Sequence, residues 1–439
     1  MKKNARSAAF AALERCEKDK AWSAAALDAA IRENELSDRD AALASRLCLG
    51  VLQNGAFLDH YIDRFSRGRL EPGVRLILRL GAYQLLFLDK VPVHAAVSET
   101  VELCRDGQFA RAASLVNAVL RRIAEIKDDP PDVAGKGTAA YLATRWSHPL
   151  WLAERLIAEK GYHFTEAFFR ENNEAAPLCI QVNRLRVSEG DYLRALERNG
   201  LKVKSFPELP GCFELEGGKV TDLPGFEEGL FYVQDRAART AVQIAGARSG
   251  MRILDVCAAP GGKSFAAALD AKADCRLISC DLLEKKLRLV RNGAERLGLS
   301  ACIETIPADA RQYRAEWEKA FDLVLADVPC SGLGVIRKRP EIRQKQASEL
   351  TELPKIQAAV LENVSRYVKP GGLLLYSTCT VLREENRDQI EEFLARHPEF
   401  QAEDFSCGAV CSTGGCYEFW PQTDGTDGFF AAKLRRKAE

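Results

Sequence analysis

The stretch Ile253-Leu-Asp-Val-Cys-Ala-Ala-Pro-Gly-Gly-Lys-Ser264 decides how the second half of the chain folds. Its apolar start predicts a buried parallel strand, and the small residues after it predict a tight loop that leads into a helix. Ligands of open α/β sheets bind at the ends of such strands. The loop is not a P-loop, because Cys257 stands where that motif has its first glycine, and it lacks the G-x-G-x-x-G pattern of dinucleotide sites. It therefore predicts a bare backbone that another ligand can approach closely.

Strands and helices alternate along the whole region from residue 234 to residue 439. Five strands are predicted, at residues 252–256, 276–280, 302–306, 321–326 and 373–376. This order predicts an α/β doubly wound, Rossmann-like domain. Right-handed crossovers then bring the carboxyl ends of the parallel strands to one edge, where their loops can share a ligand.

Length and composition predict a multidomain protein. The 439 residues are too many for one core, and the 62 basic and 62 acidic side chains cancel, so bulk charge indicates no nucleic-acid partner. The N-terminus lacks the apolar core of a signal peptide and no apolar run is long enough to span a bilayer, which predicts a cytoplasmic protein with no membrane contact. Most of the fourteen cysteines are then buried thiols. The spacing of Cys407, Cys411 and Cys416 matches no zinc or iron–sulfur pattern, so we predict no metal.

Two smaller regions precede the α/β domain. Residues 1–126 have apolar side chains at helical spacing, as at Leu76 and Leu80, and residues 127–140 have the composition of a linker. Residues 141–233 predict a small α+β module without the aromatic string of an RNA-recognition motif. Its predicted elements are a strand, a helix and two further strands, at residues 178–182, 188–199, 201–205 and 212–215.

A cluster of arginines marks the helical region. They are opposed locally by Glu71 and by Asp63 just before them. A solvated helix face and an RNA-contacting patch both fit this pattern. The cluster consists of Arg64, Arg67, Arg69, Arg75 and Arg79.

Carboxylates follow three successive predicted strands, at Asp281, Asp309 and Asp327. Asp281 lies 26 residues after Asp255, near the spacing at which an acidic side chain binds a ribose hydroxyl in nucleoside-binding sheets. Asp309 can accept a hydrogen bond from an adenine amino group. A single acidic residue after a strand is often only a helix cap, but two of them in register with a glycine-rich loop predict a nucleoside site.

Two cysteines also follow strands, Cys330 in Asp327-Val-Pro-Cys330 and Cys379 in Ser377-Thr-Cys-Thr380. One such cysteine alone would be interpreted as a core residue, but both occupy loop positions rather than apolar runs. Paired thiols suit chemistry at carbon 5 of a pyrimidine, which is a poor nucleophile until a thiolate adds to carbon 6. An acid must then stabilise the adduct at the ring nitrogen, and a base must take the carbon 5 proton before the thiolate leaves. Cys330, Cys379 and Asp327 together would supply these roles.

Two parts of the chain resemble known families. Residues 79–99 and 115–122 are similar to the NusB-like RNA-binding helical domain, which favours the RNA interpretation of the arginines. The strings at residues 255–264, 327–330 and 377–380 resemble the successive motifs of S-adenosyl-L-methionine-dependent RNA cytosine-C5 methyltransferases. The combination resembles the Sun-type branch of bacterial 16S ribosomal RNA methyltransferases, which implies a class I methyltransferase domain after the NusB-like domain.

The resemblance implies roles for individual residues. Cys379 matches the attacking cysteine of the family, and Cys330 matches the cysteine that assists release, with Asp327 beside them. Residues that match the family's cofactor site are Cys257, Ala258, Ala259, Pro260, Gly261, Gly262, Lys263, Asp281, Asp309 and Asp327. The chain departs from the family pattern where it has Ala237, Arg339 and Gln344, positions at which serine, histidine and tryptophan are common.

The cations that follow the Pro-Cys string predict a phosphate contact beside the active site, since Glu341 alone opposes them. They are Arg337, Lys338, Arg339, Arg343 and Lys345. The leading hypothesis is therefore methylation of a cytidine in 16S rRNA, either naked or in an assembly particle. The alternative is a catalytically inactive RNA-binding ribosome-assembly factor, for which two exposed thiols would have no use. A DNA cytosine methyltransferase is disfavoured, because those enzymes attack from the Pro-Cys position and would leave the NusB-like region unexplained.

Overall fold

The structure, a computed structural model, describes residues 3–217 and 219–438; residues 1–2, 218 and 439, which fall within the predicted domain ranges, lie outside it. The chain forms two compact units. One contains Met1–Ala175 together with Ile336–Ala347, and the other contains Ala176–Val335 together with Ser348–Glu439. The chain therefore leaves the second unit after Val335, contributes a short segment to the first unit, and returns. The linker at 127–140 and the module limits at 141 and 233 stay predictions.

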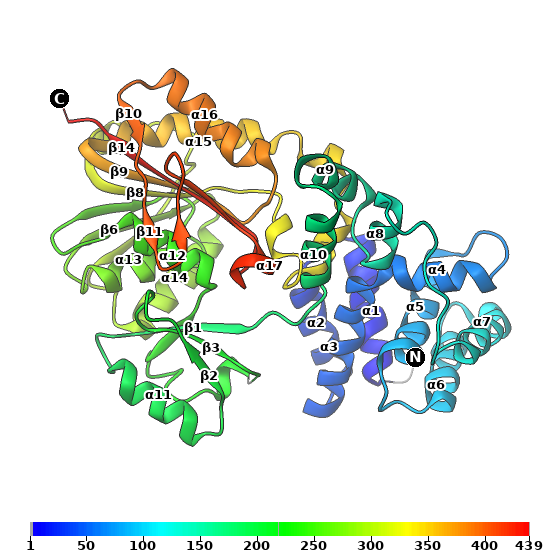
Figure 1. The fold of residues 1–439 in the computed structure, drawn as a ribbon. Coiled ribbons are helices and arrows are strands. Elements are labelled where there is room, and N and C mark those ends of the chain that lie inside the picture. Colours follow the sequence, from blue (N-terminus) through cyan, green and yellow to red (C-terminus); the bar gives the residue numbers. More distant parts are fainter. Residues whose placement is uncertain (1–2, 218, 439) are drawn as a thin grey trace. The chain divides into compact units, whose positions relative to one another are not determined.

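Helices build the first unit, as predicted for its N-terminal part (Figure 1). In α5 (Pro72–Phe87), Leu76 and Leu80 are buried, as their helical spacing predicts. α3 (Asp38–Gln53) begins where the Ser37 hydroxyl accepts a hydrogen bond from the Asp40 amide at 3.3 Å. The other helices are α1 (Ala5–Lys18), α2 (Ser23–Asn34), α4 (Gly55–Phe65), α6 (Val93–Arg105), α7 (Ala113–Glu125), α8 (Ala139–Arg145), α9 (Leu150–Lys160) and α10 (Tyr162–Glu171).

The five clustered arginines of this unit do not form one surface. Arg79 donates to both oxygens of Asp59, at 2.9 and 2.6 Å, and also contacts Glu17 at 2.9 Å. Arg75 pairs with Asp59 at 3.1 Å and with Asp63 at 2.8 Å. These two arginines stabilise the helical core, and the remaining three, Arg64, Arg67 and Arg69, are exposed.

The inserted segment carries a correction to the predicted phosphate contact. Arg343, on the short helix η5 (Pro340–Gln344), is buried, with 8% of its surface exposed. Its guanidinium donates to the carbonyl oxygens of Trp146 and Asn172, at 2.7 and 3.0 Å, and to the Asn173 side chain at 2.7 Å. Arg343 therefore binds its own chain rather than a phosphate. Burial lowers the pKa of Arg343 to about 9, which still leaves it charged at neutral pH.

The second unit begins with a small antiparallel sheet in the order β2-β3-β1-β4. The sequence predicted three of its strands and missed β4. Ser188 caps α11 (Glu189–Arg198), whose Tyr192 and Leu196 pack on this sheet. The strands are β1 (Leu178–Val182), β2 (Val203–Ser205), β3 (Cys212–Leu215) and β4 (Phe231–Val233).

A large doubly wound sheet follows, with the order β10-β14-β9-β8-β5-β6-β7. Its five predicted strands are present and parallel: β5 (Arg252–Asp255), β6 (Arg276–Asp281), β7 (Ile303–Pro307), β8 (Phe321–Asp327) and β9 (Val368–Thr378). The sequence reading missed the strands that complete the sheet. β14 (Phe429–Arg436) runs antiparallel to β9 and pairs with β10 (Phe400–Ala402) and β13 (Cys416–Phe419).

Helices cover both faces of this sheet, as Figure 1 shows for α12 to α14 and for α15 and α16. Neighbouring residues of β5 point to opposite faces, so Ile253 packs with the first group of helices and Leu254 with the second. A strand with two buried faces is apolar throughout, which is why the opening stretch could be recognised. The helices are α12 (Arg236–Ala245), α13 (Gly262–Asp270), α14 (Glu284–Leu297), α15 (Leu353–Val364) and α16 (Arg387–Arg396).

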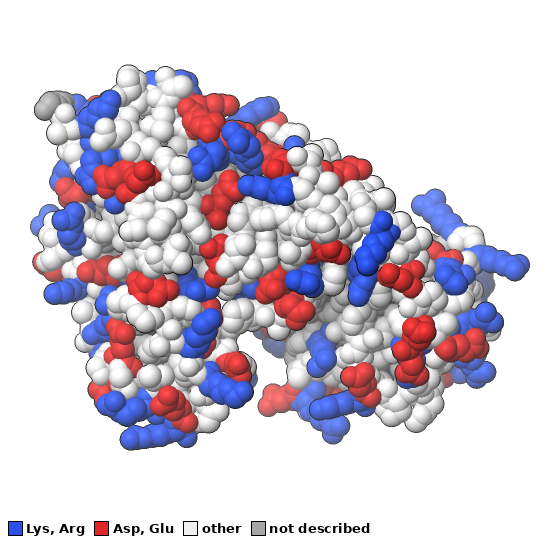
Figure 2. All heavy atoms as spheres, in the orientation of Figure 1, with Lys and Arg blue, Asp and Glu red and all other residues white. Residues whose placement is uncertain are grey.

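Every cysteine is a free thiol. Cys407 and Cys411 lie on the two-stranded ribbon of β11 (Ser406–Cys407) and β12 (Val410–Cys411), and Cys416 is buried on β13. Lys and Arg alternate with Asp and Glu over the visible face in Figure 2, in keeping with the zero net charge. Among the described residues no single helix is long and apolar enough to cross a membrane, although α3 and α4, bent by 79°, together pass that test of length and composition.

Candidate active site

The loop after β5 has a backbone that only glycine allows. Gly261 has a φ of +117°, and a Cβ atom there would lie 2.4 Å from the Phe265 ring. α13 begins at Gly262, so its first amide groups lie beside the loop. Asp255, the last residue of β5, is fully buried and accepts a hydrogen bond from Ser264 at 2.7 Å. Burial raises the pKa of Asp255 to about 7.

Lys263 pairs with Asp327 across this loop, with a distance of 2.6 Å from Nζ to Oδ2. Burial by itself would lower the pKa of Lys263, but the charge of Asp327 and its hydrogen bond outweigh that effect and raise it. The ammonium group is therefore charged at neutral pH. Asp327 also accepts a hydrogen bond from Ser377, at 2.8 Å, which joins the ends of β8 and β9.

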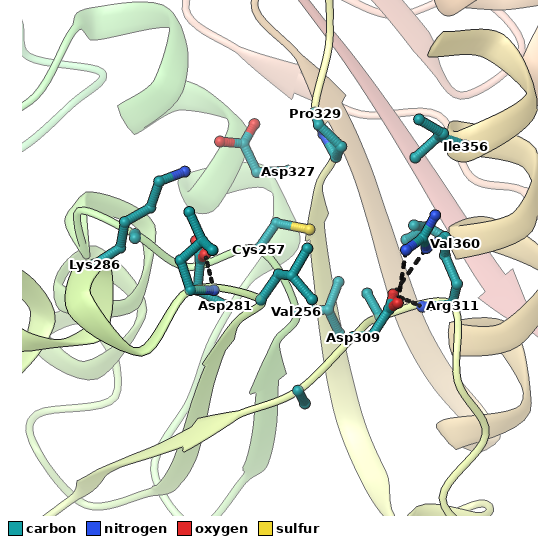
Figure 3. Close-up of a pocket in the computed structure, with 15 residues that line it drawn as sticks. Val256, Cys257, Asp281, Lys286, Asp309, Arg311, Asp327, Pro329, Ile356 and Val360 are labelled. Atoms are coloured by element: carbon teal, nitrogen blue, oxygen red, sulfur yellow. Dashed lines mark hydrogen bonds and ion pairs between the residues drawn. The ribbon is translucent and has the colours of Figure 1, made fainter. Parts of the chain in front are cut away.

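Two hollows lie at the loop. The larger, of about 370 Å³, contains the three predicted carboxylates, Asp281, Asp309 and Asp327, with apolar walls that include Ile356 and Val360 (Figure 3). The smaller, of about 170 Å³, is lined by the loop backbone. Cys257, Ala259 and Asp327 line both hollows, so the two are neighbours. Of the predicted loop residues, those that line the smaller hollow are Cys257, Ala258, Ala259, Pro260, Gly262 and Lys263.

Two of these carboxylates also have partners within the chain. Asp281 accepts a hydrogen bond from the Leu283 amide at 3.0 Å, and Asp309 binds the Arg311 guanidinium through both oxygens, at 2.9 and 2.7 Å (Figure 3). The Arg311 hydrogen bond lowers the pKa of Asp309. Both groups are therefore fixed acceptors at the rim of the larger hollow. The size of the larger hollow, its apolar walls and its carboxylates suit a nucleoside. The loop backbone in the smaller hollow suits a polar part of a ligand that approaches closely.

The two thiols predicted from sequence lie together. Cys330 Sγ and Cys379 Sγ are 3.2 Å apart, although 49 residues separate them. They meet because β8 and β9 are adjacent parallel strands in which Asp327 stands opposite Ser377. The hydrogen bond to Cys379, followed by burial and by the charges of Cys379, Glu385 and Asp327, raises the pKa of Cys330 well above its ordinary value. Cys330 is therefore protonated at neutral pH.

A pair of glycines, which the sequence reading did not select, supports the thiols. The Gly334 amide donates to the Cys379 carbonyl at 3.0 Å, and the Gly428 amide donates to the Gly334 carbonyl at 2.9 Å. A Cβ atom on Gly334 would lie 1.8 Å from the Gly428 oxygen, so only glycine permits this approach. Gly428 belongs to the string Asp424-Gly-Thr-Asp-Gly-Phe-Phe430 near the end of the chain. The sequence alone could not show that it contacts Gly334.

A glycine-rich loop after the first strand, carboxylates after the next strands and one reversed strand beside β9 define the class I, S-adenosyl-L-methionine-dependent methyltransferases. Comparison with known proteins agrees in every region. Family models match the 16S rRNA methyltransferase RsmB/F over residues 243–435, the NusB family over residues 3–125, and the ferredoxin-like domain of RsmF/B-like methyltransferases over residues 148–221. The chain belongs to the 16S rRNA methyltransferase RsmB/F family, and its cofactor is S-adenosyl-L-methionine.

Individual relatives extend over nearly the whole chain. The ribosomal RNA small subunit methyltransferase B of Cronobacter sakazakii is 34% identical and covers 92% of both chains. The probable ribosomal RNA small subunit methyltransferase B of Bacillus subtilis is 33% identical and covers 99% of both. The crystal structure of PH0851, at 25% identity and a TM-score of 0.84, covers 99% of both chains.

Proposed function

We propose that the protein methylates carbon 5 of a cytidine in 16S rRNA through a covalent bond between Cys379 and the base. The observation that carries this proposal is the 3.2 Å approach of the Cys330 and Cys379 sulfurs at the end of the strands that also present Asp327. A single thiol would serve only as a nucleophile. Two thiols in contact suit a reaction in which one sulfur must bond and later leave.

The chain's own groups account for the order of steps. The Cys379 thiolate adds to carbon 6 of cytosine, and the displaced electron pair is stabilised at the ring nitrogen by the Lys263–Asp327 pair. Bound S-adenosyl-L-methionine supplies the methyl group that carbon 5 takes. The carbon 5 proton then leaves to a base, the carbon 5–carbon 6 double bond re-forms, and Cys379 is expelled as a thiolate. We assign assistance in this last step to Cys330.

The site residues fit the cofactor. The nucleoside would lie in the larger hollow, with Asp281 at the ribose and Asp309 near the base, and the amino-acid part would lie along the loop from Cys257 to Lys263. Burial and the neighbouring carboxylates raise the pKa of Cys257 well above its ordinary value. Cys257 therefore remains a neutral wall of the site and does not compete with Cys379 as a nucleophile.

Two substitutions test the proposal. Cys379→Ala should abolish transfer of labelled methyl groups to 16S rRNA, whereas Cys330→Ala should accumulate a protein–RNA adduct that survives denaturation. Cys411→Ala, which removes an exposed thiol on β12, is the matched control. Methyl transfer by Cys379→Ala would refute the nucleophile assignment, and a wild type that binds rRNA without methylating it would favour the inactive assembly factor. Assays on naked 16S rRNA and on assembly particles would show which of the two is the substrate.

A further inference from the structure

Glu385 is a buried carboxylate that is hydrogen-bonded to the loops carrying the two thiols. It ends the short helix η8 (Arg383–Glu385) and has 1% of its surface exposed. Its three side-chain hydrogen bonds come from uncharged donors. Oε2 accepts from the Ser331 amide at 2.9 Å and from the Gln357 side chain at 2.8 Å, and Oε1 accepts from the Thr380 hydroxyl at 3.2 Å. Burying a carboxyl group is costly unless hydrogen bonds satisfy its oxygens, and these three donors do so.

Two of the donors to Glu385 are the immediate neighbours of the thiols. Ser331 follows Cys330 in the chain, and Thr380 follows Cys379. The hydroxyl groups of Ser331 and Thr380 also meet each other, at 2.5 Å. One carboxylate therefore joins the two loops at the residues that follow their sulfurs.

A third donor ties the other side of the Cys330 loop to the same carboxylate. The Gln357 amide, on α15, donates to Glu385 at 2.8 Å and to the Pro329 carbonyl at 3.0 Å. Pro329 directly precedes Cys330. Through Ser331 and Gln357 the carboxylate thus fixes the chain on both sides of Cys330.

Glu385 is itself held in place by its backbone and by the next residue. The Tyr376 hydroxyl, from β9, donates to the Glu385 carbonyl at 2.6 Å. The Asn386 side chain donates to the Thr380 carbonyl at 3.1 Å. The acceptor and both thiol loops therefore form one connected, buried network, which favours a single arrangement of the sulfur atoms.

We propose that Glu385 is the positioning residue that sets the separation and alignment of the Cys330 and Cys379 sulfurs. The proposal rests on the roles assigned to the two thiols in the proposed function. The side-chain hydrogen bonds of Glu385 go to Ser331, Thr380 and Gln357. Glu385 therefore acts on the thiols through these three residues. Its charge has a second effect, because it is one of the causes that raise the pKa of Cys330.

Substitutions can separate position from charge. Glu385→Ala removes all three acceptor bonds. In Glu385→Gln all three contacts can persist. The new amide oxygen can accept from Ser331 and Gln357, and the amide nitrogen can donate to the Thr380 hydroxyl. That hydroxyl would then donate to the Ser331 hydroxyl. We expect Glu385→Ala to lower kcat about 100-fold with KM for RNA little changed, since small misplacements of reacting groups cost about this much. Glu385→Gln should recover kcat to within about tenfold of the wild type and shift the limb of the pH–rate profile that reports Cys330 to lower pH. Glu392→Gln, the same chemical change on an exposed residue of α16, is the matched control.

A second measurement does not depend on methyl transfer. Diamide oxidises two neighbouring thiols to a disulfide and is itself reduced to the hydrazine, and peptide mass spectrometry can follow the Cys330–Cys379 bond by its loss of two hydrogens. Glu385→Ala should form this bond at least about tenfold more slowly than the wild type, and Glu385→Gln should form it at nearly the wild-type rate. Calorimetry with S-adenosyl-L-methionine shows whether each variant keeps its fold.

The outcomes separate the two proposals. Oxidation that is equally fast in Glu385→Ala and the wild type would overturn the positioning role, and so would a loss of cofactor binding that parallels the loss of kcat. If Glu385→Ala oxidises slowly and the wild type methylates no cytidine, the positioning role is supported and the proposed function is refuted.

Discussion

Asp255 should make the stability of the methyltransferase sheet depend on pH in a direction opposite to that of most carboxylates. It is fully buried at the end of β5, and burial raises its pKa from an ordinary value of 3.8 to about 7. The folded protein therefore binds this proton more tightly than the unfolded chain does. Stability from this group is fully present below about pH 4 and is lost as the pH rises through about 7.

The shift gives the size of the effect. About three pKa units at ~1.4 kcal/mol each amount to ~4 kcal/mol of lost stability once the carboxylate is ionised. In Asp255→Asn the side-chain oxygen can still accept from Ser264 Oγ, but the group no longer titrates. The stability of the variant relative to the wild type should therefore rise by ~1.4 kcal/mol per pH unit between about pH 4 and pH 7 and then level off. The slope tests the reasoning even if the amide packs less well than the acid.

Native-state hydrogen exchange is the suitable assay, because it reports the opening of β5 and α13 in the full chain. Rates must be corrected for the intrinsic pH dependence of exchange. Asp322→Asn is the control, because the pKa of Asp322 is lowered instead of raised. Burial alone would raise this pKa, but the hydrogen bond from Lys369 and the other partners outweigh burial. The Asp322→Asn difference should thus be flat above about pH 5. A flat difference for Asp255→Asn as well would refute the assignment.

Three further substitutions probe the site and its supports. Gly334→Ala should lower kcat and destabilise the second unit by ~1–3 kcal/mol, measured by steady-state kinetics and thermal unfolding, because the Gly428 backbone cannot move away from the new Cβ atom. Arg343→Lys should lower the unfolding midpoint of the first unit, at a cost of ~2–3 kcal/mol, because an ammonium group cannot make the paired hydrogen bonds of the guanidinium. Cofactor binding by calorimetry should be unchanged. An unchanged midpoint would contradict the buried role of Arg343. Lys263→Met should reduce methyl transfer by about 10²–10³-fold, with the total helix content unchanged by circular dichroism, because it removes the cation that Asp327 binds at 2.6 Å.

Local sequence patterns determined the elements of the fold and the order of the motifs. β5 could be placed because a strand buried on both faces is apolar throughout, and α5 because Leu76 and Leu80 recur at helical spacing. The candidate carboxylates and thiols could be selected because each lies at or shortly after the end of a strand. The sequence alone could therefore predict features that depend on nearby residues, such as strands, helices and the side chains at strand ends.

Only the tertiary structure decided how distant residues meet. It put Cys330 beside Cys379, because β8 and β9 are neighbours in the sheet, and it joined both thiol loops to the buried Glu385. It also turned Arg343 inward, although the sequence shows that residue only as one of a run of cations. Charge and hydrophobicity patterns report which residues can be exposed, whereas the partner of a buried cation or thiol can come from a distant segment, as Trp146 does for Arg343 and Cys379 for Cys330. The spacing between the two thiols is therefore a property of the folded sheet and not of any one motif.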